Sequence, residues 1–179
     1  MIRIIAGKFR GRTIDTPNVQ TTKPTMDRVR AGMFSAINFD IYNSVVLDLF
    51  AGSGSFGFEC LSRGASHASF VELNDEAYRV IQRNAGRLQV INNIEIYKED
   101  VLTFLNNSKP HSYDIIFADP PYKLDVYNDL LSIIINKGLL KDNGILILES
   151  DNNLNIINPY FKKIKQYKYG LAYITILRK

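Results

Sequence analysis

The sequence predicts an α/β protein built around a doubly wound, largely parallel sheet. Three aliphatic runs, each closed by a turn or a carboxylate, are typical of parallel strands buried on both faces, and they lie at residues 45–50, 115–117 and 145–148. Between them, apolar residues recur at helical spacing at residues 77–88 and 130–135. Strands and helices that alternate in this way form βαβ units, and consecutive units build a doubly wound sheet.

Shorter segments complete the predicted order of elements. Two further strand candidates, residues 69–72 and 94–97, lie between the first two long runs. Two more strands are expected near the C-terminal end, at residues 161–167 and 171–177, with Gly170 between them.

The segment before this alternation predicts a hairpin followed by a helix. Gly7 and Gly11 are candidate bend residues of a hairpin over residues 2–14. A helix is expected over about residues 26–37, opened by Pro24-Thr25.

Length and composition indicate one globular domain. The 179 residues suffice for one α/β core and not for two of ordinary size, and 46% hydrophobic and 22% charged residues are near globular averages. We expect a single domain over residues 1–179, in which residues 1–40 form the hairpin and helix and residues 41–179 the core. No apolar run approaches the length of a membrane span. The apolar stretch at the N-terminal end is too short for a signal peptide, so we expect a cytoplasmic protein.

Charge is unevenly distributed along the chain, although the net charge is only +4. Residues 1–30 carry seven basic and two acidic side chains, and residues 152–179 carry six basic side chains and no acidic one, so the middle has a net charge of −7. A basic start and end suit a polyanionic partner, but charged termini also serve solubility. Charge alone does not separate these interpretations.

Residues 48–57 combine a strand end, a glycine-rich turn and a helix start. Gly52, Gly54 and Gly57 have the G-x-G-x-x-G spacing at which a ligand approaches the backbone closely, so an NAD site has to be considered. Asp48 favours a different ligand. A carboxylate four residues before Gly52 would repel a pyrophosphate, whereas it would attract the ammonium group of S-adenosylmethionine.

Two further carboxylates at strand ends fit the same ligand. Glu72 is suited to a bidentate bond to two ribose hydroxyls, and Asp100 to the adenine amino group, although a helix N-cap explains Asp100 equally well. The candidate cofactor residues are Asp48, Phe50, Ala51, Gly52, Gly54, Glu72, Leu73, Asp100 and Val101.

The candidate catalytic residues Asp119, Pro120, Pro121 and Tyr122 follow a predicted strand, at the sheet edge where doubly wound sheets bind ligands. An exocyclic base amine is a poor nucleophile because its lone pair is delocalised into the ring. Asp119, aided by the Pro120 carbonyl, would orient the amine and stabilise positive charge that develops on it. The prolines stiffen the backbone, and Tyr122 offers a ring on which an extruded base could stack. The alternative is a turn that merely ends a strand.

Cysteine and histidine chemistry is not expected. Cys60 lies on the helical stretch after the glycine turn, where a small buried residue is its simplest role. This argues against methylation of a pyrimidine carbon, which needs covalent attack by a cysteine. One cysteine forms no internal disulfide, and His67 and His111 lie far apart, so no metal is expected.

These motifs, in this order, resemble the bacterial family that methylates guanine N2 in 16S ribosomal RNA of the small subunit. The resemblance covers nearly the whole chain and rests on Arg3-Ile4-Ile5-Ala6-Gly7, Arg10-Gly11-Arg12, Pro24-Thr25-Met26-Asp27-Arg28-Val29-Arg30, residues 48–57 and Asp119-Pro120-Pro121-Tyr122. It implies the seven-stranded class I (Rossmann-like) methyltransferase fold with an N-terminal β-hairpin. It also implies S-adenosylmethionine as donor, and a late assembly intermediate or the whole small subunit as substrate.

The chain departs from the family pattern at three positions. Met26 and Ala31 stand where polar residues are usual, and Leu171 replaces a customary Thr after Tyr169-Gly170. These departures affect the expected contacts of the predicted 26–37 helix more than the expected methyl-transfer chemistry.

Basic side chains of the N-terminal segment are the candidate RNA-binding residues. Arg10 and Arg12 flank Gly11, so on an extended strand they would share one face and could contact neighbouring phosphates. The alternative is a hairpin that only covers a sheet edge. The full set is Arg3, Lys8, Arg10, Arg12, Arg28 and Arg30, and the partner would be 16S ribosomal RNA bound by a monomer.

Three other functions stay open at this point. An enzyme of the same fold could act on adenine N6 in DNA or on a protein glutamine amide, because the Asp119–Tyr122 motif suits planar amines generally. An NAD-binding oxidoreductase would explain the glycines and Glu72, but it leaves Asp119–Tyr122 without a role. A noncatalytic RNA-binding assembly factor is compatible with every residue.

Overall fold

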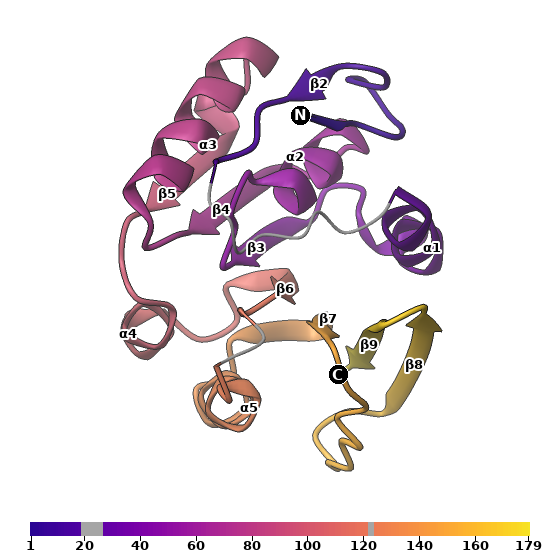
Figure 1. Ribbon diagram of the computed structural model, residues 1–179. Helices are drawn as coiled ribbons and strands as arrows, with labels where there is room; N and C mark the ends of the chain where they lie inside the picture. Colours follow the sequence, from indigo (N-terminus) through magenta and orange to yellow (C-terminus); the bar gives the residue numbers. More distant parts are fainter. Residues whose placement is uncertain (19–26, 122–123) are drawn as a thin grey trace.

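A seven-stranded mixed sheet with helices on both faces forms the centre of the protein (Figure 1). The structure, a computed structural model, describes residues 1–18, 27–121 and 124–179. The strand order is β5-β4-β3-β6-β7-β9-β8. The first five strands in this order run parallel to one another, and β9 is antiparallel to both of its neighbours. The strands are β3 (Val45–Leu49), β4 (His67–Val71), β5 (Ile94–Tyr97), β6 (Tyr113–Ala118), β7 (Leu140–Ser150), β8 (Lys163–Tyr169) and β9 (Ala172–Arg178).

The winding of the chain reverses between β3 and β6. From β3 the chain proceeds outward to β4 and β5, and it then returns to pair β6 with the other side of β3. Such a reversal leaves a crevice at the carboxyl ends of the strands, which is where doubly wound folds bind ligands. The doubly wound α/β fold predicted from the sequence is confirmed.

Five described helices cover the two faces of the sheet (Figure 1). One face carries α1 (Asp27–Ala36), α2 (Ser55–Ser62) and α3 (Asp75–Leu88), and the other carries α4 (Val101–Asn107) and α5 (Tyr127–Asn136). Two 3₁₀ turns, η1 (Asn38–Asp40) and η2 (Ile91–Asn93), join elements. None of these described helices combines the length and the apolar character that crossing a membrane requires.

Side chains that point alternately to the two faces of the sheet divide the hydrophobic core into two clusters. In β6, Ile115 and Phe117 belong to the cluster under α1–α3, while Ile116 and Ala118 belong to the cluster under α4 and α5. Successive side chains of a strand point to opposite faces, so one continuous apolar run supplies both cores.

Strand β7 begins earlier than the aliphatic run at 145–148 predicts. Leu140 already pairs with Tyr113, and the register shifts before Ile115 pairs with Ile145. Residues 141–143 in this irregular part are polar, so a search for apolar runs does not detect the early part of β7. The predicted C-terminal strands are present as the antiparallel pair β8 and β9. Helix α1 matches the predicted helix, whose opening at Pro24-Thr25-Met26 lies outside the described residues.

The N-terminal hairpin is present as β1 (Ile2–Arg3) paired with β2 (Thr13–Ile14), and it packs on α2 rather than on a sheet edge. Glu59 of α2 is fully buried, and its carboxylate accepts from the backbone N–H groups of Ile5 (2.8 Å) and Ala6 (3.0 Å). Gly7 lies so close that a Cβ atom there would be 1.8 Å from the Ser62 carbonyl oxygen. The idea that the hairpin covers a sheet edge is therefore wrong.

Candidate active site

The glycine-rich turn joins β3 to α2 at the carboxyl edge of the sheet. Phe50, Gly52 and Gly54 all have positive φ angles, of 56°, 56° and 77°, so the turn is tightly wound. A Cβ atom on Gly54 would lie 2.7 Å from the Phe58 ring, and one on Gly57 would lie 2.4 Å from the Phe70 ring. The glycines therefore allow close packing of helix and strand as well as ligand approach.

Asp48 is the buried carboxylate of this turn. Its side chain is 1% exposed, and its Oδ2 accepts from the Gly57 backbone N–H at 3.0 Å. Burial raises its pKa well above the ordinary value, the Gly57 bond opposes this shift, and the charges of Asp119 and Glu72 add to it. A cation placed near Asp48 would relieve this cost.

Glu72 follows β4 and holds the turn in place. One carboxylate oxygen accepts from the Gly52 N–H at 2.8 Å and the other from the Asn74 N–H at 2.7 Å. A carboxylate oxygen has two acceptor sites, so both oxygens keep capacity for ribose hydroxyls. Leu73, the next residue, is 64% exposed at the same edge.

Asp100 is the N-cap of α4. Its side chain accepts from the backbone N–H of Thr103 at 3.0 Å and from its hydroxyl at 3.2 Å, so the capping role considered from the sequence is confirmed. A second role toward adenine stays a prediction. Val101 begins the helix and is buried beneath it.

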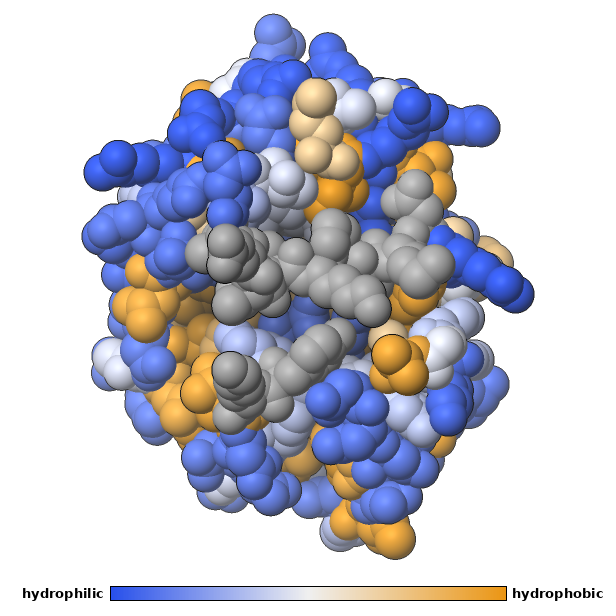
Figure 2. Space-filling model, viewed as in Figure 1, coloured by the Kyte–Doolittle hydropathy of each residue, from blue (hydrophilic) through white to orange (hydrophobic). Residues whose placement is uncertain are grey.

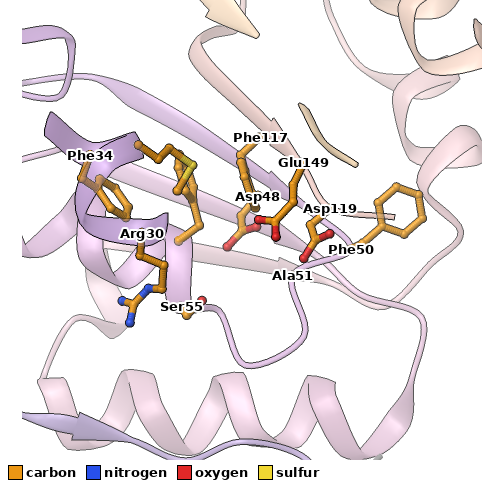
Figure 3. A pocket seen from close by; sticks show the side chains of 11 residues that line it. Arg30, Phe34, Asp48, Phe50, Ala51, Ser55, Phe117, Asp119 and Glu149 are labelled. Carbon is orange, nitrogen blue, oxygen red and sulfur yellow. The ribbon is translucent and has the colours of Figure 1, made fainter. Parts of the chain in front are cut away.

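A hollow opens beside Asp48, and three carboxylates line it (Figure 3). Asp48 comes from β3, Asp119 follows β6 and Glu149 lies near the end of β7, and their side chains gather in one place. Apolar and aromatic side chains form the remaining wall, together with Ser55 and Arg30; they are Met33, Phe34, Phe50, Ala51, Phe56 and Phe117.

Asp119 reaches this hollow in an environment that favours its protonated form. Burial raises its pKa well above the ordinary value, and the nearby charge of Glu149 raises it further. Pro120 behind it is buried and Pro121 is exposed, while Tyr122 lies outside the described residues. A perturbed carboxyl in a pocket at a sheet edge is typical of a functional group.

Glu149 is the site residue that the sequence interpretation missed. Glu149 is 3% exposed. In the sequence it is the carboxylate that closes the aliphatic run at residues 145–148, and the pattern indicates only a strand there. That position was the available signal, because parallel strands bring their carboxyl ends to one edge. The aromatic wall was missed as well, since Phe34, Phe56 and Phe117 come from three separate elements and stack only in the fold (ring centroids 5.2 Å and 4.1 Å apart).

The predicted cofactor residues divide into two groups. Asp48, Phe50 and Ala51 line the hollow. The others lie along the same sheet edge at the ends of β3, β4 and β5 without lining it; they are Gly52, Gly54, Glu72, Leu73, Asp100 and Val101.

Arg30 does not belong to the exposed basic surface predicted from the sequence. It is 2% exposed, its guanidinium donates to the Arg3 carbonyl (3.1 Å) and pairs with Glu59 (3.4 Å), and it lines the hollow. Glu59 is anchored inside the protein and draws the guanidinium inward, which is why Arg30 is buried.

The other predicted RNA-binding side chains are exposed. Hydrophilic side chains predominate on the face of the molecule drawn in Figure 2. Arg10 lies in the turn between β1 and β2, where its N–H donates to the Gly7 carbonyl. The extended strand expected for Arg10 and Arg12 is therefore wrong. The exposed set is Arg3, Lys8, Arg10, Arg12 and Arg28.

Comparison with known proteins connects this site to methyltransferases. The sequence model of the family named Conserved hypothetical protein 95 matches residues 2–178. Ribosomal RNA small subunit methyltransferase D of Buchnera aphidicola is 33% identical over 178 residues, which cover 97% of this chain and 93% of that protein. The chain belongs to this methyltransferase D family.

Solved structures agree with this membership. A putative methyltransferase, yhhF, from Escherichia coli superposes with a TM-score of 0.87 at 28% identity, covering 99% of this chain and 97% of that one. An RNA methyltransferase from Salinibacter ruber, in complex with S-adenosyl-L-homocysteine, has the same fold at 14% identity (TM-score 0.66, covering 87% and 93%). The chain is accordingly a class I methyltransferase dependent on S-adenosylmethionine, and the seven-stranded fold implied by the resemblance is confirmed.

Three carboxylates around one hollow fit such a donor. S-Adenosylmethionine carries positive charge on its ammonium and sulfonium groups, whereas a dinucleotide would bring a pyrophosphate toward Asp48, Asp119 and Glu149. Family membership and this charge pattern both favour methyl transfer over the oxidoreductase considered from the sequence.

Proposed function

We propose that the chain methylates the exocyclic N2 of a guanine in 16S ribosomal RNA of the small subunit. The observation that carries this is the meeting of Asp119, Asp48 and Glu149 in one hollow at the switch point of the sheet (Figure 3). Relatives named ribosomal RNA small subunit methyltransferase D support ribosomal RNA as the substrate class.

The donor half of the site is formed by the ends of β3, β4 and β5. Bound there, S-adenosylmethionine supplies an activated methyl group on a positively charged sulfur. Asp48 balances positive charge of the donor, Glu72 accepts from its ribose hydroxyls, and the glycine turn lets it lie against the backbone. Asp100 faces adenine in this proposal.

The acceptor half is formed by Asp119 and the residues around it. Asp119 accepts a hydrogen bond from the guanine amine, which orients the nitrogen lone pair toward the methyl carbon. As the new C–N bond forms and the C–S bond breaks, positive charge develops on the nitrogen, and one amine proton has to leave. Asp119 is placed to take it, and the charge of Glu149 strengthens it as a base by raising its pKa.

The N-terminal hairpin and α1 form the proposed RNA-facing surface. Arg3, Lys8, Arg10, Arg12 and Arg28 are exposed there, whereas the centre of the chain is acidic in sum. A phosphate backbone needs local cations, and these side chains supply them. We propose that the chain binds a small subunit or a late assembly intermediate as a monomer in the cytoplasm.

Nucleoside analysis tests the reaction. Purified protein is incubated with labelled S-adenosylmethionine and either 16S ribosomal RNA or small subunits that lack the modification, and the RNA is digested and analysed by mass spectrometry. We expect N2-methylguanosine with the unchanged chain and none with Asp119→Ala. N6-methyladenosine instead would show that the adenine alternative is correct, and labelled protein without labelled RNA would favour the glutamine alternative.

A further inference from the structure

The turn between β8 and β9 lies at the active-site edge of the sheet. Strand β7 runs parallel to β6 and ends at Ser150, which pairs with Tyr173, while Tyr169 pairs with Ala172. Since Glu149 precedes Ser150, the turn at residues 169–172 lies beyond the same strand ends that surround the hollow. The opposite end of β8, around Lys163, points away from this edge.

Helix α1 connects this turn to the wall of the hollow. Tyr169 packs so closely on Gly32 that a Cβ atom there would be 2.4 Å from the tyrosine hydroxyl. Met33 and Phe34, the next residues of α1, line the hollow. Through Tyr169 the β8–β9 turn therefore abuts the outer side of one pocket wall, while Lys168 and Tyr173 lie on the other face of the sheet at the same edge.

The exposed side chains of the turn combine apolar, aromatic and cationic groups. Leu171 is 78% exposed at its tip. Lys168 is exposed, and its Nζ lies 5.2 Å from the centroid of the half-buried Tyr173 ring. Residues 152–179 contain six basic side chains and no acidic one.

We propose that the β8–β9 turn, residues 168–173, is a second RNA contact that binds single-stranded nucleotides flanking the target base. This inference rests on the proposed function and specifies how the substrate is held. A base that reacts in the hollow must leave its stack, and RNA bases are most accessible to proteins in single-stranded loops and bulges, so we expect the flanking nucleotides to be exposed at this edge. Aromatic and apolar surfaces bind bases, and a lysine beside them binds phosphate, which is the chemistry that Tyr173, Leu171 and Lys168 present.

A structural explanation exists for the lysines of β8, and it makes a different prediction. Lysines on an edge strand prevent pairing with other chains, and that role would apply along the whole strand. It does not explain an exposed leucine at the tip beside the active site. The two ends of β8 therefore separate the two explanations.

Matched double variants at the two ends provide the experiment. Lys168→Gln with Leu171→Ser alters the turn, and Lys162→Gln with Lys163→Gln removes more charge at the far end. Binding of a fluorescent single-stranded RNA from the target region is followed by anisotropy at several salt concentrations. Loss of one base contact and one phosphate contact should raise the Kd of the turn variant about tenfold and reduce its salt slope by about 0.7. Donor affinity and the melting temperature should not change.

The turn variant is compared with the far-end variant and with the unchanged protein. The far-end variant should keep its RNA affinity within about twofold. Equal weakening in both variants would show a bulk charge effect, and an unchanged Kd in the turn variant would show that RNA does not contact the turn; either result overturns the inference. Normal RNA binding with poor turnover on intact subunits would instead indicate a protein contact and also overturn it. If the unchanged chain binds RNA through the turn but forms no N2-methylguanosine, the contact stands and the proposed reaction fails.

Discussion

Asp48 and Asp119 are carboxyl groups that the fold holds against their own ionisation. Burial raises both pKa values above those of the unfolded chain. A carboxyl whose pKa is higher in the folded state binds its proton more tightly there, so stability that is present below the unfolded pKa is lost as the pH rises through the folded pKa. Ionising these two carboxyl groups therefore costs stability, which is typical of functional residues.

Replacing the Asp119 carboxyl should therefore separate activity from stability. Asp119→Asn keeps the shape but removes the ionisation, so methyl transfer should fall at least about a hundredfold while donor binding stays nearly intact. At pH 7 the variant should melt at a higher temperature than the unchanged protein, because the amide has no ionised form to bury. Single-turnover kinetics and calorimetry measure the two effects. Near-normal turnover would contradict the proposed mechanism.

Glu149 should act on the reaction through Asp119. Its charge raises the Asp119 pKa, so the rate of methyl transfer, which needs the ionised Asp119, should decline as the pH falls through that raised pKa. In Glu149→Gln the pKa of Asp119 should be lower, and the decline should move to lower pH. The rate profile from pH 5 to pH 9 provides the measurement. An unshifted profile in a well-folded variant would show that Glu149 does not tune Asp119.

At the scale of elements, the N-terminal hairpin combines a buried anchor with an exposed basic turn. Glu59 binds the backbone of residues 5 and 6 from inside, whereas Arg10 and Arg12 lie in the turn and are exposed. Anchor and turn can therefore be altered separately, and the two changes should affect different properties.

We expect Arg10→Gln with Arg12→Gln to weaken RNA binding while the melting temperature stays the same. Each lost phosphate contact should reduce the salt slope of RNA binding by about 0.7–0.9. Gly7→Ala is the contrasting variant, because a Cβ atom would clash with the Ser62 carbonyl at a φ of 80°, and it should destabilise the fold on the order of 3 kcal/mol. If the arginine variant lost stability instead of RNA affinity, the hairpin would be a structural element only.

For the whole molecule, the charge pattern predicts which ligand the sheet edge selects. The three carboxylates of the hollow should exclude a pyrophosphate and accept a cationic donor. Titration calorimetry should show binding of S-adenosylmethionine and its demethylated product and none of NAD. Glu72→Ala should weaken the donor at least about tenfold through its lost ribose contacts. Comparable NAD affinity, or an unaffected Glu72→Ala variant, would refute this assignment.

Most strands and helices could be predicted from local sequence patterns. Aliphatic runs and helical spacing located β3, β6, the later part of β7, and α3 and α5, because a strand or helix with buried faces leaves a period in its own sequence. The early part of β7 was not predictable in this way, since residues 141–143 are polar and join the strand only by pairing near Tyr113.

Contiguous motifs predicted the chemistry at the turn and the strand ends: Asp48 before the glycines, Glu72 after its strand and Asp119 before two prolines. Each motif is contiguous, so its chemistry can be read without knowledge of the rest of the chain. Three arrangements became visible only in the folded chain: Glu149 lies beside Asp119, Arg30 is buried against Glu59, and the β8–β9 turn abuts α1. These arrangements depend on which strands become neighbours and on which charges are anchored inside, and neither leaves a local trace in the sequence.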